Sequence, residues 1–182
     1  FYGLDLYSPP VAFFNAVIAT HMGRFGSAAR IWVVSQPCDR KHPTILALRS
    51  KWPVHFLTAH DAAVTCNSEP SCRSAVLDFI WMQAAAHIVL SPSTFGWWPA
   101  FLSTRAETVH YPLYPAFSPW GAHAWCHLMP EDDPRFLFHD VWANVTWRGG
   151  EIDGREARRR CETYMNACER DHVCAIDASS AA

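Results

Sequence analysis

A turn rich in hydroxyl side chains is the part of the sequence best suited to chemistry. Ser91, Ser93 and Thr94 lie between an apolar run that predicts a strand, His87–Leu90, and a stretch that predicts a helix, Phe95–Ser103. In open α/β sheets, ligands bind beyond the carboxyl ends of the strands, where a helix N-terminus offers backbone N–H groups and a positive dipole end. The pattern predicts a phosphate or diphosphate site, with a plain helix cap as the alternative role for Ser93 or Thr94.

An acidic residue lies one predicted helix before this turn. Asp78 belongs to Cys72–Ala86, a largely apolar stretch that predicts a long helix. Carboxylates placed in this way commonly accept hydrogen bonds from ribose hydroxyls or from the edge of a base. The alternative is a carboxylate that points to solvent. For Trp97 and Trp98, packing in a core or an interface is favoured over a platform for sugar.

Short apolar runs alternate with helical stretches along the first two thirds of the chain. This alternation predicts a Rossmann-like α/β fold, with a parallel sheet covered by helices on both faces. Gly23 is expected to end the first helix. The predicted helices are Val11–Met22, Thr44–Lys51, Cys72–Ala86 and Phe95–Ser103, and the predicted strands are Ile31–Ser35, Val54–Thr58, His87–Leu90 and Thr108–Tyr111.

The remaining sequence predicts less regular structure. Residues 112–134 replace periodicity with Pro, Trp and His, which indicates an irregular wrap, and Glu131-Asp132-Asp133 within it predicts a solvated turn. The end of the chain is rich in charge and predicts a separate helix near Arg155–Arg170. We therefore expect an α/β domain over residues 1–150 and a charged helical tail over residues 151–182.

Composition excludes several classes of protein. The chain has 182 residues, of which 50% are hydrophobic and 18% charged, so it can bury a core, and its net charge of -2 provides no field for nucleic acid. No apolar stretch reaches the length of about 20 residues that a membrane span needs. Because the chain begins at Phe1 rather than at a methionine, any membrane anchor is expected upstream. The seven cysteines contain no Cys-x-x-Cys pair, so no metal site is expected.

Two features favour the lumen of the secretory pathway. Cys66 and Cys72 flank a short loop and are candidates for a small disulfide, and Asn144-Val145-Thr146 is an N-glycosylation sequon. Each feature also has an ordinary explanation. An unpaired cysteine is a common buried residue, and a sequon of three residues often arises by chance.

The run from Asp78 to Trp98, with Ser93-Thr94-Phe95-Gly96-Trp97-Trp98 at its centre, resembles the C-terminal signature of glycosyltransferase family 11, the α-1,2-fucosyltransferases. Ile31–Ser35 and Val109–Pro112 resemble two strands of that family more faintly. The resemblance implies the C-terminal, donor-binding half of a GT-B-type, metal-independent, inverting Golgi enzyme. Such an enzyme transfers fucose from GDP-fucose to a glycan hydroxyl. The nucleotide-sugar-binding residues that it implies are Asp78 for the guanosine and Ser91, Ser93, Thr94 and Phe95 around the diphosphate.

The sequence departs from the family pattern in three places. The arginine-containing His-x-Arg-x-x-Asp segment is absent and is expected upstream of Phe1, so the chain alone lacks a principal anion-binding residue. Gln36-Pro37 replaces an acidic pair, and Pro99 replaces a small residue, so that the helix either starts later or bends. No catalytic base is assigned, because three histidines are candidates by residue type alone: His110, His123 and His127.

Two other functions remain open. A diphosphate site does not identify the base or the sugar, so a transferase that uses another nucleotide sugar is the first alternative. The second is a non-catalytic module that binds carbohydrate or protein through the aromatic stretch Tyr114–Trp125.

The disulfide is directly testable. If Cys66 and Cys72 are bridged, peptide mapping of the unreduced protein by mass spectrometry will find their two peptides linked. Reduction should then separate the peptides, which is the internal control. Two free thiols would remove the main cysteine argument for a lumenal protein.

Overall fold

The computed structural model describes residues 9–35, 40–57, 72–91, 93–113, 130–140, 144–151, 155–156 and 159. Its helices are α1 (Val11–Phe25), the short 3-10 helix η2 (Gly26–Ala28), α2 (Pro43–Lys51), α3 (Cys72–Gln83) and α4 (Thr94–Leu102). Its strands are β1 (Ile31–Val33), β2 (Val54–Phe56), β3 (His87–Val89), β4 (Thr108–Leu113), β5 (Phe136–Asp140) and β6 (Val145–Arg148).

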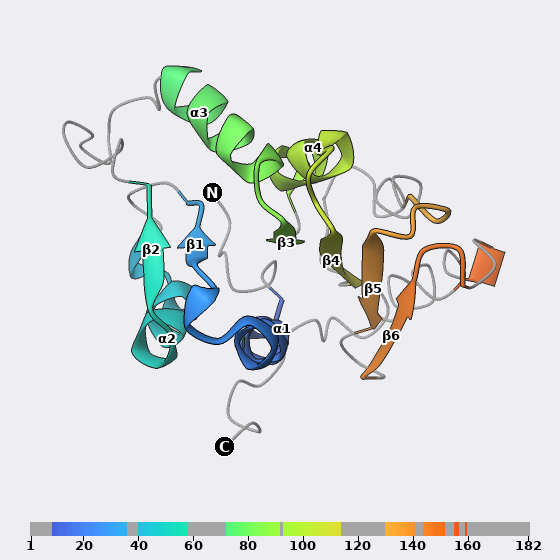
Figure 1. The fold of residues 1–182 in the computed structure, drawn as a ribbon, viewed down its shortest axis with the longest axis horizontal. Helices are drawn as coiled ribbons and strands as arrows, with labels where there is room; N and C mark the ends of the chain where they lie inside the picture. Colours follow the sequence, from blue (N-terminus) through green and yellow to red (C-terminus); the bar gives the residue numbers. More distant parts are fainter. Residues whose placement is uncertain are drawn as a thin grey trace, which may run out of the picture.

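The strands form two sheets between two layers of helices. β1 pairs with β2 in parallel, and β3, β4, β5 and β6 form a second sheet in that order. Figure 1 shows the strands side by side from β2 and β1 to β6, with α3 and α4 on one side and α1 and α2 on the other. The predicted α/β fold with helices on both faces is confirmed. The predicted strands do pair in parallel, β1 with β2 and β3 with β4, but they lie in two sheets rather than one. The second sheet is mixed, because the unpredicted β6 pairs with β5 in the antiparallel direction.

Helix α1 continues beyond its predicted end. Gly23 lies inside the helix, and the chain turns only at Gly26, whose φ of 56° is the left-handed conformation that glycine adopts readily. A glycine inside a helix costs about 1 kcal/mol, which does not end a helix that is held by packing. Pro99 likewise lies inside α4, which begins at Thr94, so of the two alternatives for this helix, a later start or a bend, the later start is wrong.

The region after β4 differs most from the prediction. Pro112 and Leu113 belong to β4 rather than to an irregular wrap, and β5 and β6 were not predicted. Residues 114–129, with the aromatic stretch, lie outside the described part of the chain, as does most of the predicted tail helix. In the described residues, no helix combines the length and hydropathy needed to cross a bilayer.

The main core lies between the four-stranded sheet and α4. Side chains alternate along β5, so that Phe136 and Phe138 are buried while Leu137 and His139 face the other side. Phe138 lies 5.6 Å from Tyr111 and 6.1 Å from Trp147, measured between ring centroids. The buried core residues are Ile88, Leu90, Trp97, Ala100, Ala106, Val109, Tyr111, Leu113, Phe136, Phe138 and Trp147.

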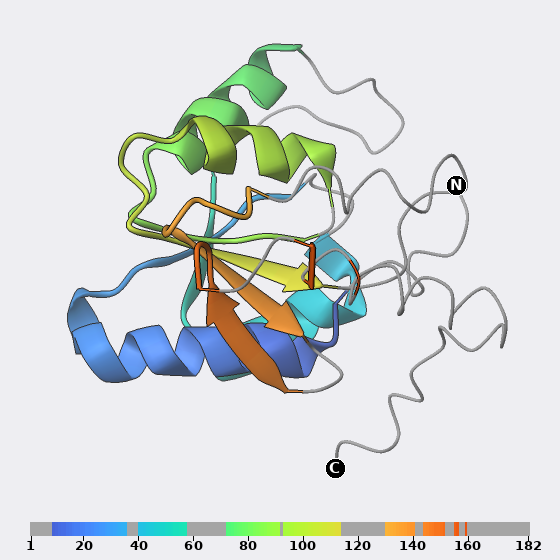
Figure 2. The same cartoon turned by 90° about the vertical axis from the view of Figure 1, so that its right-hand side faces the viewer.

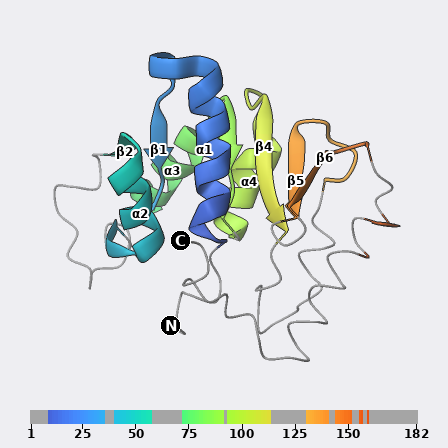
Figure 3. The ribbon, with the colours of Figure 1, turned by 90° about the horizontal axis from the view of Figure 1, so that it is seen from below.

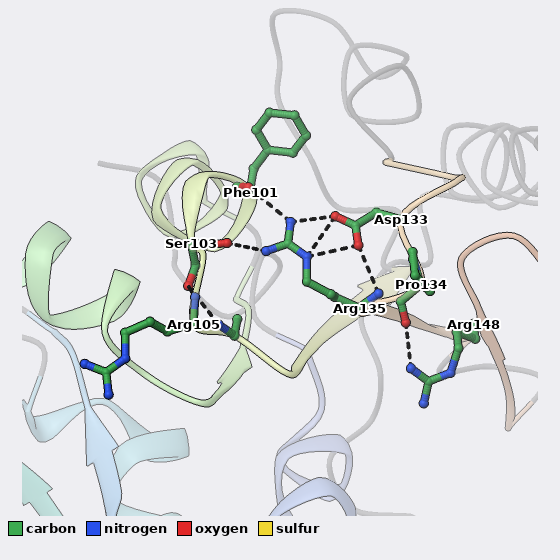
Figure 4. Close-up of polar contacts among 8 residues, drawn as sticks. Phe101, Ser103, Arg105, Asp133, Pro134, Arg135 and Arg148 are labelled. Atoms are coloured by element: carbon green, nitrogen blue, oxygen red, sulfur yellow. Dashed lines mark hydrogen bonds and ion pairs between the residues drawn. The ribbon is translucent and has the colours of Figure 1, made fainter.

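A polar cluster ties the ends of α3 and α4 to the start of β5 (Figure 4). We call Ser103, Asp133 and Arg135 the Arg135 junction. The Ser103 hydroxyl donates to the carbonyl of Gln83 at 2.7 Å, and the Arg135 guanidinium donates to the carbonyls of Phe101 and Ser103. Arg135 also forms an ion pair with Asp133 at 2.6 Å and thereby lowers the pKa of that carboxyl. Asp133 is therefore part of a structural cluster, and only the turn itself was predicted correctly.

We expect Arg135→Ala to lower the free energy of unfolding by about 2–3 kcal/mol, because it removes charge-assisted hydrogen bonds to two helix carbonyls and to Asp133. Urea denaturation measures the change. Arg105→Ala is the matched control, since Arg105 is exposed in the same loop, and it should change stability by less than about 0.5 kcal/mol. Equal effects of the two substitutions would show that the junction contributes nothing.

Candidate functional site

The helix that connects β1 to β2 and the helix that connects β2 to β3 lie on opposite sides of the sheets. The connection from β1 to β2 carries α2 on the α1 side of the sheets, whereas the connection from β2 to β3 carries α3 on the opposite side (Figure 1). Such a reversal is a topological switch point, and ligands bind there beyond the carboxyl ends of the strands. Figure 2 shows the first turn of α4 at the edge toward which β4 and β5 point. The predicted hydroxyl turn therefore lies at this edge.

Ser93 is the N-cap of α4. Its hydroxyl oxygen accepts a hydrogen bond from the Phe95 N–H at 3.2 Å, and its carbonyl accepts from the N–H groups of Gly96 and Trp97 at 3.1 and 3.0 Å. The capping role weighed for Ser93 is thus confirmed. Those three N–H groups are already used within the helix. At Ser93 itself, the hydroxyl proton and the positive end of the helix dipole remain available to an anion.

The other predicted residues lie in or beside this turn. Ser91 is exposed just after β3, and Thr94 is the first residue of α4. The Phe95 side chain is 43% exposed and lies 6.5 Å from Phe79 of α3, measured between ring centroids. Asp78 precedes Phe79 and is buried, so the alternative of a solvent-exposed carboxylate is wrong. The middle of α3 and the first turn of α4 therefore form one region.

Two polar residues at the ends of β1 and β2 were not predicted as site residues. The Ser35 hydroxyl oxygen, just beyond β1, is buried and has no hydrogen-bond partner among the described residues. Arg40 lies beyond β2, where its guanidinium donates to the Leu57 carbonyl at 3.4 Å and lies 4.9 Å from the centre of the Phe56 ring. Ser35 could have been predicted as a site residue, because it ends a predicted strand. Arg40 could not, because its position near the end of β2 depends on tertiary contacts with Leu57 and Phe56.

Four histidines lie between the sheet and α1, the helix that crosses this face of the strands in Figure 3. His21 of α1 is hydrogen-bonded to His110 of β4 at 2.9 Å, and His110 to His139 of β5 at 2.9 Å. His87 of β3 lies 4.4 Å from His21, measured between ring centroids. We call these four residues the histidine layer. His110, a candidate base by residue type, belongs to it, while His123 and His127 lie outside the described residues.

Burial keeps the histidine layer neutral near pH 7. It lowers the pKa of His110 to about 3. Arg148 and any of the other three histidines that become protonated lower it further by repulsion. Burial also lowers the pKa of His139 to about 4. No group of three or more His, Cys, Asp or Glu among the described residues has an arrangement that could hold a metal ion. The histidine layer thus places neutral imidazoles between α1 and the sheet.

The predicted lumenal features are described only in part. Asn144 is exposed in the turn before β6, with a φ of 51°, so its side chain is accessible for modification. Cys66 lies outside the described residues. Cys72 is the first residue of α3, and its side chain is not described.

The comparisons with known proteins give one family. Residues 52–113 match the model of glycosyl transferase family 11. This range runs from just after α2 to the end of β4 and so includes the α3 region and the first turn of α4. No curated protein and no solved structure is significantly similar to the chain. The resemblance predicted from the sequence is confirmed for this range, and the match supports a glycosyltransferase.

The histidine layer predicts a loss of stability in mild acid. The pKa values of His110 and His139 are lower in the folded protein than the ordinary value of about 6.5 in the unfolded chain. The unfolded chain therefore binds protons first, and stability falls as the pH drops from 6.5 toward 4. We expect a loss of about 2–4 kcal/mol by pH 5, measured by urea denaturation at several pH values.

A double variant tests the cause of this loss. His110→Gln with His139→Gln should unfold more easily at pH 7.5 but should lose less stability between pH 7 and pH 5. An unchanged pH dependence would show that other groups are responsible.

Proposed function

We propose, on the premise that residues 52–113 match glycosyl transferase family 11, that the chain is the donor-binding part of a fucosyltransferase. In this proposal the enzyme moves fucose from GDP-fucose to a glycan hydroxyl with inversion. The family match carries the proposal, because it covers α3, β3, α4 and β4, the elements around the switch point. We further propose a GT-B-type arrangement, in which this α/β domain binds the donor and another part of the enzyme contributes to the acceptor side.

The diphosphate is proposed to lie at the first turn of α4. The positive end of the helix dipole favours an anion there, and the Ser93 hydroxyl can donate its proton while its oxygen caps the Phe95 N–H. Ser91, two residues before Ser93, and Thr94, directly after it, are proposed to contribute their hydroxyl groups to the same contact. These groups would stabilise the negative charge that develops on the departing diphosphate.

The base is proposed to lie on the α3 side of the same turn. Asp78 is buried, and its neighbour Phe79 contacts the exposed Phe95 ring at the start of α4. A carboxylate can accept two hydrogen bonds from the donor groups on the guanine edge. Uracil and adenine do not present the same pair of donors, so Asp78 would provide selectivity for GDP.

The negative charge of the diphosphate requires a compensating group. Arg40 provides a guanidinium beyond β2, and the buried Ser35 hydroxyl beyond β1 has no hydrogen-bond partner among the described residues. Both lie beyond the carboxyl ends of β1 and β2, on the β1 side of the switch point, so we propose that they face the donor. With a guanidinium in this place, we propose a reaction that needs no metal cofactor. The acceptor hydroxyl would then attack the anomeric carbon in line with the diphosphate.

A location in the secretory pathway, in the Golgi lumen, is part of the same proposal. The exposed position of Asn144 supports it, since N-glycosylation requires an accessible asparagine in this compartment.

Substitutions at Ser93 separate ligand binding from helix capping. Asp and Asn cap helices as well as Ser does, so both variants should keep the melting temperature of the protein. Ser93→Asp places a negative charge beside the diphosphate, and we expect it to weaken GDP binding at least tenfold in calorimetric titration. The neutral Ser93→Asn should weaken binding less. Equal affinity of all three proteins for GDP would remove the diphosphate from this turn.

Asp78→Asn tests recognition of the base. We expect the wild-type chain to bind GDP more tightly than UDP or ADP, and the variant to lose that preference. Ser50→Ala, at the exposed end of α2, is the control and should leave GDP affinity unchanged. If no nucleotide binds to a folded wild-type chain, this chain does not form a donor site by itself. A preference for UDP or ADP would instead indicate another nucleotide sugar.

A further inference from the structure

The outward side of α3 and α4 is apolar. Figure 1 shows these two helices as the outer layer on one side of the sheets. Eight large apolar side chains of α3 and α4 are 40 to 56% exposed. Two of them, Leu77 and Trp81, are on the part of α3 near β1, where the Trp81 ring lies 5.0 Å from that of Trp32 between centroids. We call the other six the outer apolar face: Val76 and Ile80 of α3, and Phe95, Trp98, Phe101 and Leu102 of α4.

The helical spacing places these side chains on one surface. Val76 and Ile80 are four residues apart, and so are Trp98 and Leu102, so each pair lies on one side of its helix. The contact between Phe79 and Phe95, with 6.5 Å between ring centroids, holds the two helices side by side. The exposed sides of α3 and α4 are therefore continuous.

Charge is missing from this surface. From Ser74 to Leu102, Asp78 is the only Asp, Glu, Lys or Arg in the sequence, and Asp78 is buried. A helix that faces water normally carries its charged residues on the outer side and its apolar residues on the inner side. Here the carboxylate lies inside, and Val76 and Ile80 lie outside. Surfaces rich in Trp and Phe and depleted of charge are typical of the cores of protein interfaces.

We propose that the outer apolar face pairs with the same face of a second copy of this chain. A large side chain has about 150–250 Å² of surface, so the exposed fractions leave roughly 500 Å² of apolar area on this face. A stable interface buries about 800 Å² on each partner, of which about 65% is apolar in homodimers. The face thus has the apolar area that one partner of a homodimer contributes.

Two-fold symmetry suits this surface. In a two-fold symmetric dimer the same surface of both copies is in contact, so a charged side chain near the axis would lie close to the identical charge of the partner. An uncharged face of aliphatic and aromatic side chains complements itself without that cost. The absence of Lys and Arg from the face also favours a protein partner over an anionic lipid surface, which attracts basic residues. This inference does not require the proposed transfer reaction, although Phe95 of the face also lies beside the proposed donor site.

Sedimentation equilibrium of the full chain, from about 1 to 50 µM, tests the proposal. We expect the wild-type mass to approach twice the 20.6 kDa of one chain. Ile80→Glu and Leu102→Glu each place a charge on the face without touching Ser93 or Asp78, and each should weaken dimerisation at least tenfold. Leu46→Glu is the matched control, because Leu46 is 47% exposed on α2, on the other side of the molecule, and it should leave the dimer intact.

Circular dichroism and the melting temperature must first show that the variants are folded, and a non-reducing denaturing gel must exclude an intermolecular disulfide. A wild-type chain that stays monomeric up to about 50 µM would overturn the proposal. So would a dimer that persists in both folded variants. A monomer that floats with phosphatidylcholine vesicles, and loses this binding in the same two variants, would identify the face as a membrane contact instead.

Discussion

The position of the candidate site depends on how Arg135 and Ser103 hold the ends of α3 and α4. The Ser103 hydroxyl binds the last carbonyl of α3, and Arg135 binds carbonyls at the end of α4. A guanidinium suits this place, because helix C-termini carry partial negative charge and Asp133 adds a full one. Since α4 is only nine residues long, holding its end also restricts where its first turn lies.

That first turn constrains the chemistry of the site. Ser93 uses its own hydroxyl and carbonyl oxygens to accept hydrogen bonds from the N–H groups of Phe95, Gly96 and Trp97, so these three amides are not free to bind a diphosphate. A dipole end and neutral hydroxyl groups bind a charged diphosphate more weakly than a guanidinium does. This is why Arg40, at the other strand ends, is part of the proposed site. The two halves of the switch point then contribute different groups to one ligand.

Polar side chains usually lie outside and apolar side chains inside, and this protein departs from that distribution in two places. Imidazoles lie beneath α1, where burial lowers the pKa of His110 and His139, whereas aliphatic and aromatic side chains lie on the outside of α3 and α4. Each arrangement has its own free-energy cost. The histidine layer lowers the stability of the fold below neutral pH, because buried imidazoles resist protonation. The outer apolar face exposes apolar side chains to water, and pairing with a second copy of the chain would remove that exposure.

Local sequence patterns determined much of the scaffold and the place of the candidate site. The apolar runs of β1 to β4, the start of α4 at Ser93-Thr94 and the family resemblance around them could all be interpreted from neighbouring residues, because strands, caps and turns depend on short-range properties. The expectation that Gly23 ends α1 was wrong, since packing overrides a weak local preference.

Tertiary structure alone decided the rest. β5 mixes His139 and Asp140 with aromatic residues, and only its pairing between β4 and β6 makes it a strand. The burial of Asp78, the chain of histidines and the contacts of Arg135 likewise join residues far apart in the sequence. No local pattern encodes such contacts, because their free energy arises only when the sheet and both helix layers have come together.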